Sequence, residues 1–215
     1  MNLSRVLHPS DYQLFTEHLA IAGIREILKR YYRYEHEHRK WEYGLALKAV
    51  LDSESRTVLD VGGGGAILSP LLSHYGCEVT QLDLDSGENE IAYQNQFLSN
   101  KMKFMYGDFS KELNVGKFDS VVSISTIEHV HDDNTFFINL LEHANKNVFL
   151  TMDFFPTGET FSKDHLRTYS KERIYEFCAV ASKLNFTPEF SPYTYRGNYV
   201  YDYTFASLHL TRNNK

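Results

Sequence analysis

Four consecutive glycines follow a short apolar run that ends in an aspartate, in the stretch "VLDVGGGGAILS". Because glycine has no Cβ, such a run lets a ligand come close to the backbone. Gly62 and Gly64 fit the first two positions of the G-x-G-x-x-G turn of dinucleotide-binding proteins, but Ile67 occupies the third. The stretch therefore predicts a small-molecule site and disfavours a nicotinamide cofactor.

Acidic residues end four of the predicted strands, at Asp60, Asp83, Asp108 and Asp153. The carboxyl ends of parallel strands meet at one edge of a sheet, and ligands of open α/β sheets bind outside that edge. A carboxylate there can accept hydrogen bonds from ribose hydroxyls or from an amino group. One such acid alone would more simply be solvated, but as a series these acids indicate a ligand site.

A turn that contains two histidines, "EHVHDD", follows the fourth predicted strand. Histidine titrates near neutral pH, so His129 is a candidate general base, with a backbone-bonded histidine at a helix start as the alternative. Asp153 could orient a substrate hydroxyl, assist a base, or bind a metal together with Asp132. A metal needs several convergent oxygen ligands, and we predict none here.

Strands and helices must alternate along the chain to position these residues. The strand patterns are "RTVLDV", "EVTQLDLD", "MKFMYGD", "FDSVVSIS" and "NVFLTMD", and two more strands joined by a tyrosine-rich loop close the chain. This alternation predicts an α/β fold with a doubly wound, mostly parallel seven-stranded sheet and one antiparallel strand. We expect residues 1–52 to form an N-terminal helical cap and residues 53–215 a Rossmann-like domain, together one compact domain.

Capping residues predict where the helices begin and end. Ser69 and Pro70 are typical of an N-cap and a first turn, and Gly76 of a helix end. Asp133 is expected to cap the helix after the fourth strand. Further helices are expected over residues 88–99 and from about Ser170 to Leu184.

Composition narrows the class of protein. The chain has 215 residues and a net charge of −6, which argues against a nucleic-acid binder because such proteins need a basic face. We find no apolar run as long as a membrane span, and the first residues lack the apolar core of a signal peptide. Cys77 and Cys178 match no metal-ligand spacing, so we expect reduced thiols and a cytoplasmic protein.

The order of four motifs over roughly residues 40–155 resembles that of the class I S-adenosylmethionine-dependent methyltransferases. Residues 60–66 match the first motif, an acid followed by a glycine turn. Asp83 stands at the second, an acid that ends strand two. Gly107-Asp108 stands at the third, and "FDSVVSISTIEHV" at the fourth. A chance glycine turn would not bring the other three motifs with it.

The resemblance implies S-adenosylmethionine as the methyl donor and S-adenosylhomocysteine as the product. Asp83 would accept hydrogen bonds from the ribose hydroxyls, and Asp108 from the adenine amino group. Trp41 could close over the cofactor or simply pack its own helix. The implied cofactor contacts are Trp41, Asp60, Gly62, Gly63, Gly64, Asp83, Leu84, Asp108, Phe109 and Ser125.

We expect O-methylation of a small hydroxylated acceptor such as a sugar or glycan, with His129 and Asp153 as catalytic residues. The stretches "RKWEYGLALKAVL" and "DFFPTGETFSKDHL" resemble a subset of methyltransferases of glycan and small-molecule pathways. The tyrosine-rich loop at residues 193–203 could stack on a sugar ring. The alternatives are an N-methyltransferase acting on a small amine, nucleic acid or protein, and a non-catalytic partner module that retains the fold.

Overall fold

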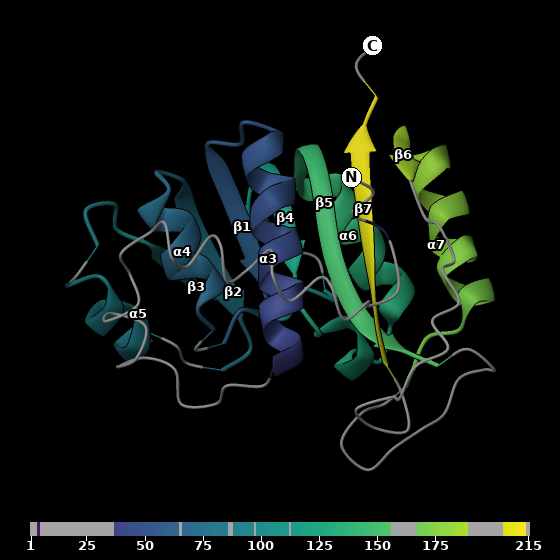
Figure 1. Cartoon of the computed structure of the whole chain (residues 1–215), viewed down its shortest axis with the longest axis horizontal. Helices are drawn as coiled ribbons and strands as arrows, with labels where there is room; N and C mark the ends of the chain where they lie inside the picture. The colour runs from purple at the N-terminus through teal and green to yellow at the C-terminus, as the bar shows by residue number, and fades with distance from the viewer. Residues whose placement is uncertain are drawn as a thin grey trace.

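Seven strands form one sheet in the order β3-β2-β1-β4-β5-β7-β6 (Figure 1). The computed structural model describes residues 4, 37–64, 66–85, 88–96, 98–111, 113–155, 167–188 and 204–213. The strands are β1 Thr57–Val61, β2 Glu78–Asp83, β3 Lys103–Tyr106, β4 Phe118–Ser123, β5 Ala144–Phe154, β6 Phe186–Pro188 and β7 Thr204–Arg212.

Strands β1 to β5 pair in parallel, and β7 runs antiparallel to both of its neighbours, β5 and β6. This confirms the predicted doubly wound, mostly parallel sheet with one antiparallel strand. The order reverses between β1 and β4, so the topological switch point lies between the carboxyl ends of these two strands.

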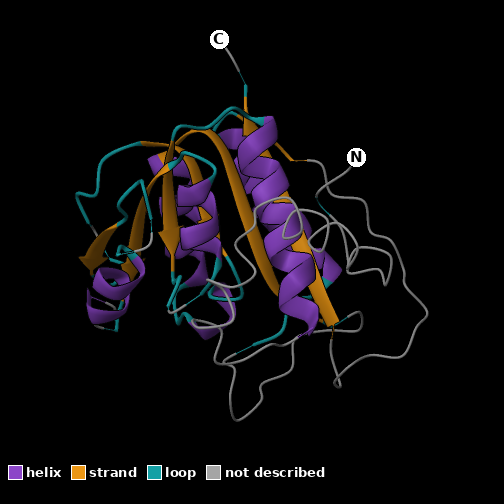
Figure 2. Ribbon diagram, turned by 60° about the vertical axis from the view of Figure 1, so that its left-hand side comes forward, coloured by secondary structure: helices purple, strands orange, loops and turns teal. Residues whose placement is uncertain are grey.

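Helices cover both faces of the sheet (Figures 1 and 2). The helical elements are α3 Glu37–Asp52, α4 Leu68–His74, α5 Glu88–Gln94, the 3₁₀ turn η2 Ile127–His129, α6 Asp133–His143 and α7 Lys171–Lys183. Alternation along the strands feeds two cores. Val58, Val122 and Phe149 pack in the core with α3, α4 and α5. Leu59 and Val121 pack in the opposite core with α6 and α7.

Two of the predicted helix caps are wrong by one or two residues. Helix α4 begins at Leu68 after Ile67, so Ser69 lies inside its first turn, where the Ser69 hydroxyl donates to Asp60 instead. Asp132, rather than Asp133, caps α6 by accepting from the Thr135 backbone N–H, because the Asp133 carboxylate is taken by arginine side chains.

Two other predicted helix ends agree with the structure, and one predicted helix is too long. Gly76 follows α4 with φ +94°, the left-handed conformation of a glycine stop. Ser170 caps α7 by accepting from the Arg173 N–H, as predicted. Helix α5 ends at Gln94, shorter than the predicted range of 88–99. Just beyond it, the Asn95 side chain donates to the Met102 carbonyl and accepts from the Met102 N–H. These bonds link the chain after α5 to the segment before β3.

The described part of the N-terminal region packs on the sheet. Helix α3 contributes Trp41, Leu45 and Val50 to one core, so these residues share their packing with the strands. Ser4 lies beside β7, where its Oγ accepts from the His209 N–H at 2.6 Å and donates to the His209 carbonyl at 3.1 Å. The rest of the predicted helical cap before residue 37, and the tyrosine-rich loop at 193–203, lie outside the described residues. None of the described helices is long and apolar enough to cross a membrane.

Candidate active site

The glycine turn lies at the switch point, directly after β1. Gly62 and Gly64 have φ of +74° and +50°, which L side chains rarely adopt. A Cβ on Gly62 would lie 2.3 Å from Thr126 Cγ2, in the segment that follows β4. The ends of β1 and β4 are therefore packed against each other through a position that only glycine fits.

Strand β2 holds the glycine turn from the other side. Gln81 Nε2 donates to the Gly64 carbonyl at 2.6 Å, and the Gly64 N–H donates to Asp83 Oδ2 at 2.8 Å. A Cβ on Gly63 would lie 2.2 Å from Gln81 Nε2 and 2.7 Å from Asp60 Oδ2. The glycine turn and the side chains that pack against it thus form a tightly held cradle at the switch point. Sequence reasoning missed Gln81, although it precedes Asp83 by two residues and so shares its face of β2.

Asp83 ends β2 beside this cradle, and Leu84 follows it. Asp83 Oδ1 also accepts from the Asp85 N–H at 3.0 Å, so backbone groups already orient the carboxylate. Its remaining lone pairs are available to ribose hydroxyls. The Leu84 side chain is 58% exposed, an apolar surface at the edge where a flat ring could pack. Both positions are compatible with the predicted cofactor contacts.

Asp108 forms a local turn after β3. Its Oδ1 accepts from the Ser110 N–H at 3.0 Å and from the Ser110 hydroxyl, and Lys111 Nζ lies 3.0 Å from its Oδ2. The Ser110 hydroxyl and then Lys111 hold the pKa of the Asp108 carboxyl below its usual range. The Phe109 side chain is buried against Phe136, so a cofactor contact at Phe109 would use its backbone. The adenine contact of Asp108 stays a prediction.

Asp60 is a buried carboxylate beneath the glycine turn. Its Oδ2 accepts from Ser69 Oγ at 2.6 Å. Burial raises the pKa of Asp60 to about 6, the Ser69 hydrogen bond opposes that shift, and the nearby charge of Asp83 adds to it. Asp60 therefore takes up a proton in the folded protein at a higher pH than in the unfolded chain.

We expect the contribution of Asp60 to the stability of the protein to fall as pH rises from about 4 to about 6, because only the folded state retains the Asp60 proton there. Asp60→Asn has no proton to lose, so it should be more stable than the unaltered protein above pH 6, by about 1–3 kcal/mol. This advantage should vanish below about pH 4. Urea unfolding at both pH values measures it. A stability difference that is the same at both pH values would contradict the assignment.

The segment after β4 carries an unusual backbone. Ser125 has φ +45°, a conformation that costs a residue with a side chain about 1–2 kcal/mol. Its N–H donates to Thr151 Oγ1 at 3.0 Å, and its hydroxyl donates to Glu42 Oε1 in a short hydrogen bond. Thr151 Oγ1 donates to the same Glu42 oxygen at 2.6 Å. Sequence reasoning predicted a role for Ser125 but missed Glu42, which is fully buried on α3.

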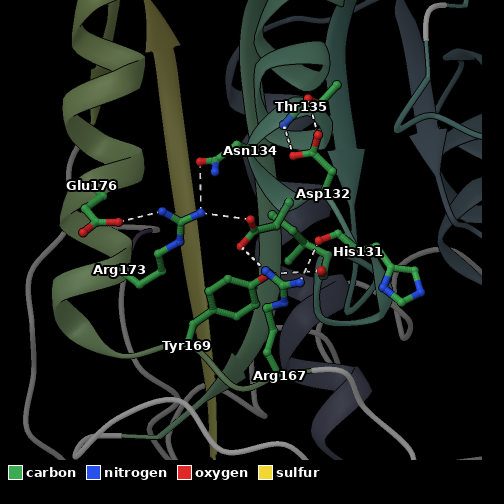
Figure 3. Close-up of polar contacts among 10 residues, drawn as sticks. His131, Asp132, Asn134, Thr135, Arg167, Tyr169, Arg173 and Glu176 are labelled. Atoms are coloured by element: carbon green, nitrogen blue, oxygen red, sulfur yellow. Dashed lines mark hydrogen bonds and ion pairs between the residues drawn. The ribbon is translucent and has the colours of Figure 1, made fainter.

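Side chains from α6, α7 and the segment before α7 form a polar cluster beside His131, two residues after His129 (Figure 3). Asp133 accepts from Arg167 and Arg173, each at 2.9 Å. Arg167 also donates to the His131 carbonyl at 2.8 Å, two residues after His129.

Tyr169 forms hydrogen bonds to the backbone near His129 and at Asp153, the two predicted catalytic residues. Its hydroxyl donates to the Ile127 carbonyl at 3.0 Å, two residues before His129, and its N–H donates to the Asp153 carbonyl at 2.8 Å. Burial, reinforced by the Asp133 charge, raises the pKa of the Tyr169 phenol well above its usual range, which keeps it a donor. The backbone on both sides of His129 is thus held in place, while the His129 side chain is exposed.

Asp153 and Trp41 are buried rather than exposed at the site. Asp153 is 1% exposed and shares the α3 face of β5 with Thr151, whereas Met152 packs in the opposite core with Ile127. Trp41 is 0% exposed and packs in the core under α3, as its packing alternative expects. The roles of Asp153 in catalysis and of Trp41 in cofactor binding stay predictions.

Comparisons with known proteins find methyltransferases. Residues 59–151 match the family described as "Methyltransferase domain". The ubiquinone biosynthesis O-methyltransferase of Rickettsia canadensis is 34% identical over 100 residues, which cover 45% of this chain and 41% of the relative. The mitochondrial ubiquinone biosynthesis O-methyltransferase of Schizosaccharomyces pombe is 27% identical over 96 residues, which cover 43% of this chain and 35% of the relative. The chain thus spans about two fifths of the length of these relatives or less.

The fold match extends over nearly the whole chain. The magnesium protoporphyrin IX methyltransferase of Synechocystis, crystallised with bound S-adenosylmethionine, superposes with a TM-score of 0.60. The match covers 94% of this chain and 97% of that one at 17% identity, which shows a shared fold. Residues 59–151 thus match a methyltransferase domain, and the chain shares the fold of a solved S-adenosylmethionine-binding methyltransferase, with the glycine cradle at the switch point of that fold.

Proposed function

We propose that the protein transfers a methyl group from S-adenosylmethionine to a hydroxyl of a small acceptor. The observation that carries the proposal is the cradle of Gly62 and Gly63, where a Cβ would collide with Thr126 or Gln81. This cradle lies at the carboxyl edge of the sheet, where open α/β folds bind ligands, and Asp83 beside it is an acceptor for hydroxyl groups. S-adenosylmethionine would supply the methyl group: the acceptor oxygen would bond to the methyl carbon as the carbon–sulfur bond breaks, and S-adenosylhomocysteine would leave as a neutral thioether.

The protein has two tasks in such a transfer, alignment of the reactants and removal of the hydroxyl proton. We assign the proton to His129, which is exposed after β4 on a turn whose backbone Tyr169 and Arg167 hold. Asp153 would orient the acceptor or assist the base from the end of β5. The nearby acids Asp60 and Asp83 give the cradle a negative character that suits a cation.

The names of the relatives support transfer to oxygen, since both are O-methyltransferases of ubiquinone biosynthesis. They do not support the sugar or glycan acceptor expected from the sequence. We therefore propose a ring hydroxyl, as in a phenol or quinol, as the acceptor class to test first. Polyanions should be poor acceptors because the chain carries a net charge of −6.

A radiolabel transfer assay tests this proposal. We expect methyl transfer from labelled S-adenosylmethionine to catechols or quinols, and little or none to amines, nucleotide sugars, glycans or tRNA. Each acceptor needs a parallel reaction with excess S-adenosylhomocysteine, which should suppress true turnover. Efficient methylation of amines or of RNA, with phenols inert, would overturn the proposed acceptor class.

We also propose a cytoplasmic location. Its support is that Cys77 and Cys178 are free thiols. Burial raises the pKa of Cys178 to about 11, so it stays protonated and unreactive.

A further inference from the structure

Glu42 is a carboxylate with no exposed surface, and it lies on α3 rather than on any cofactor motif. Burial of a charge is unfavourable unless hydrogen bonds stabilise it. Two hydroxyls, from Ser125 and Thr151, donate to the same Glu42 oxygen. These donors come from the segment after β4 and from β5, so Glu42 joins three elements that are far apart in sequence.

The Glu42 contacts hold Ser125 in its left-handed conformation. Ser125 is bound at two atoms, through its hydroxyl to Glu42 and through its N–H to Thr151 Oγ1. Since Thr151 itself donates to Glu42, a closed ring of hydrogen bonds joins the Glu42 and Thr151 side chains to the hydroxyl and the backbone N–H of Ser125. A serine with φ +45° is unfavourable on its own, and this ring offsets the strain.

The conformation of Ser125 sets the position of the next residue, Thr126. Thr126 Oγ1 donates to the carbonyls of Ile124 at 3.1 Å and Val61 at 3.4 Å, which places it over the start of the glycine turn. Its side chain occupies the space that a Cβ on Gly62 would need. A rotation at Ser125 would therefore move one wall of the cradle.

We propose that Glu42 is a positioning residue for S-adenosylmethionine: it holds Ser125 left-handed so that Thr126 and the glycine turn keep the form that receives the cofactor. Glu42 acts through Ser125 and need not touch the cofactor. The proposal rests on the cofactor part of the proposed function and is independent of the acceptor.

Calorimetric titration of the full chain with S-adenosylhomocysteine tests it. Glu42→Ala should weaken binding about tenfold or more, whereas Glu42→Gln, which keeps an acceptor oxygen, should weaken it less. Ser125→Gly placed in the Glu42→Ala protein should restore at least about threefold of the loss, because glycine adopts a positive φ without help. The Ser125→Gly variant alone completes the double-mutant cycle.

Ser120→Ala is the matched control. Ser120 is a buried hydroxyl at the other end of β4, bonded to Ser55, so its loss lowers stability without touching the cradle. We expect its affinity for S-adenosylhomocysteine to equal that of the unaltered protein.

Steady-state kinetics give a second measurement. Glu42→Gln should raise the KM for the cofactor and leave kcat nearly unchanged.

Three results would overturn the proposal: unchanged affinity in Glu42→Ala, no restoration by Ser125→Gly, or an equal loss of affinity in Ser120→Ala. If Glu42→Ala does not fold, the affinities of Glu42→Gln and of the double variant Glu42→Gln, Ser125→Gly for S-adenosylhomocysteine test the proposal instead. An unaltered protein that fails to bind S-adenosylhomocysteine would instead refute the cofactor assignment.

Discussion

His129→Ala is expected to lower turnover by roughly a hundred- to ten-thousand-fold, the usual contribution of a positioned general base. An acceptor hydroxyl has a pKa far above neutrality and attacks poorly until its proton is taken. His129 is exposed on η2, beyond the end of β4, and its neighbours Ile127 and His131 have their carbonyls held by Tyr169 and Arg167. A base with a fixed backbone is well placed to meet a bound acceptor.

The affinity of His129→Ala for S-adenosylhomocysteine should stay nearly unchanged, because His129 is not among the residues expected to contact the cofactor. His131→Ala is the matched control, since His131 is exposed two residues away and uses its carbonyl, which the substitution keeps, to bind Arg167. Turnover on the true acceptor is measured from about pH 6 to about pH 9, the range in which a histidine base changes its charge. Near-normal turnover across that range would eliminate His129 as the base. Asp153 or a metal-bound hydroxyl would then be the leading candidate for the base. Loss of activity in a chelator would indicate the metal-bound hydroxyl, and unchanged activity would indicate Asp153.

Gly62→Ala is expected to destabilise the protein by about 2–5 kcal/mol, the sum of backbone strain and overpacking. Alanine would have to adopt φ +74° and place its Cβ 2.3 Å from Thr126 Cγ2. The cradle can relieve this collision only by moving Thr126 away. Binding of S-adenosylhomocysteine should therefore weaken by at least about a hundredfold, or about 2.7 kcal/mol.

Two other glycines separate the collision from the backbone strain. Gly116 has φ +84° and no described atom within 4 Å of its Cβ position, so Gly116→Ala should cost about 1–2 kcal/mol of stability and no cofactor affinity. Gly64→Ala, with Asp83 Oδ2 3.9 Å away, should behave like Gly116→Ala in stability. Urea unfolding and calorimetry measure both quantities. Equal effects of Gly62→Ala and Gly116→Ala on binding would show that Thr126 is not a wall of the cradle.

Features with a short sequence range could be predicted well. The position of the glycine turn could be predicted from residues 60–66 alone, and the strands from apolar runs of a few residues. The one antiparallel strand followed from two consecutive strands with no helix between them, now β6 and β7. In each case the physical cause lies within one element or its nearest neighbour.

Features that depend on distant partners could not be predicted. Asp132 and Asp133 are both chemically suited to cap α6, and the choice depends on Arg173, which is 40 residues away from Asp133. Glu42 lies 83 residues from Ser125 and 109 from Thr151, and its pattern "WEYG" reads as an ordinary helix face. A sequence shows that a polar residue is present, but only the fold shows which groups surround it.

The contact between Ser4 and His209 bears on which positions of β7 are open to pairing with another strand. Among the described strands, β6 pairs only with Leu210–Arg212, so β7 continues beyond it toward Thr204. A strand edge with open N–H and carbonyl groups is a template for pairing with another molecule, and proteins commonly block such edges. The Ser4 hydroxyl satisfies both backbone groups of His209, at the point where the β6 ladder ends. The Ser4 side chain thus forms the two hydrogen bonds that a neighbouring strand would otherwise form with His209, and this position is closed to intermolecular β-pairing.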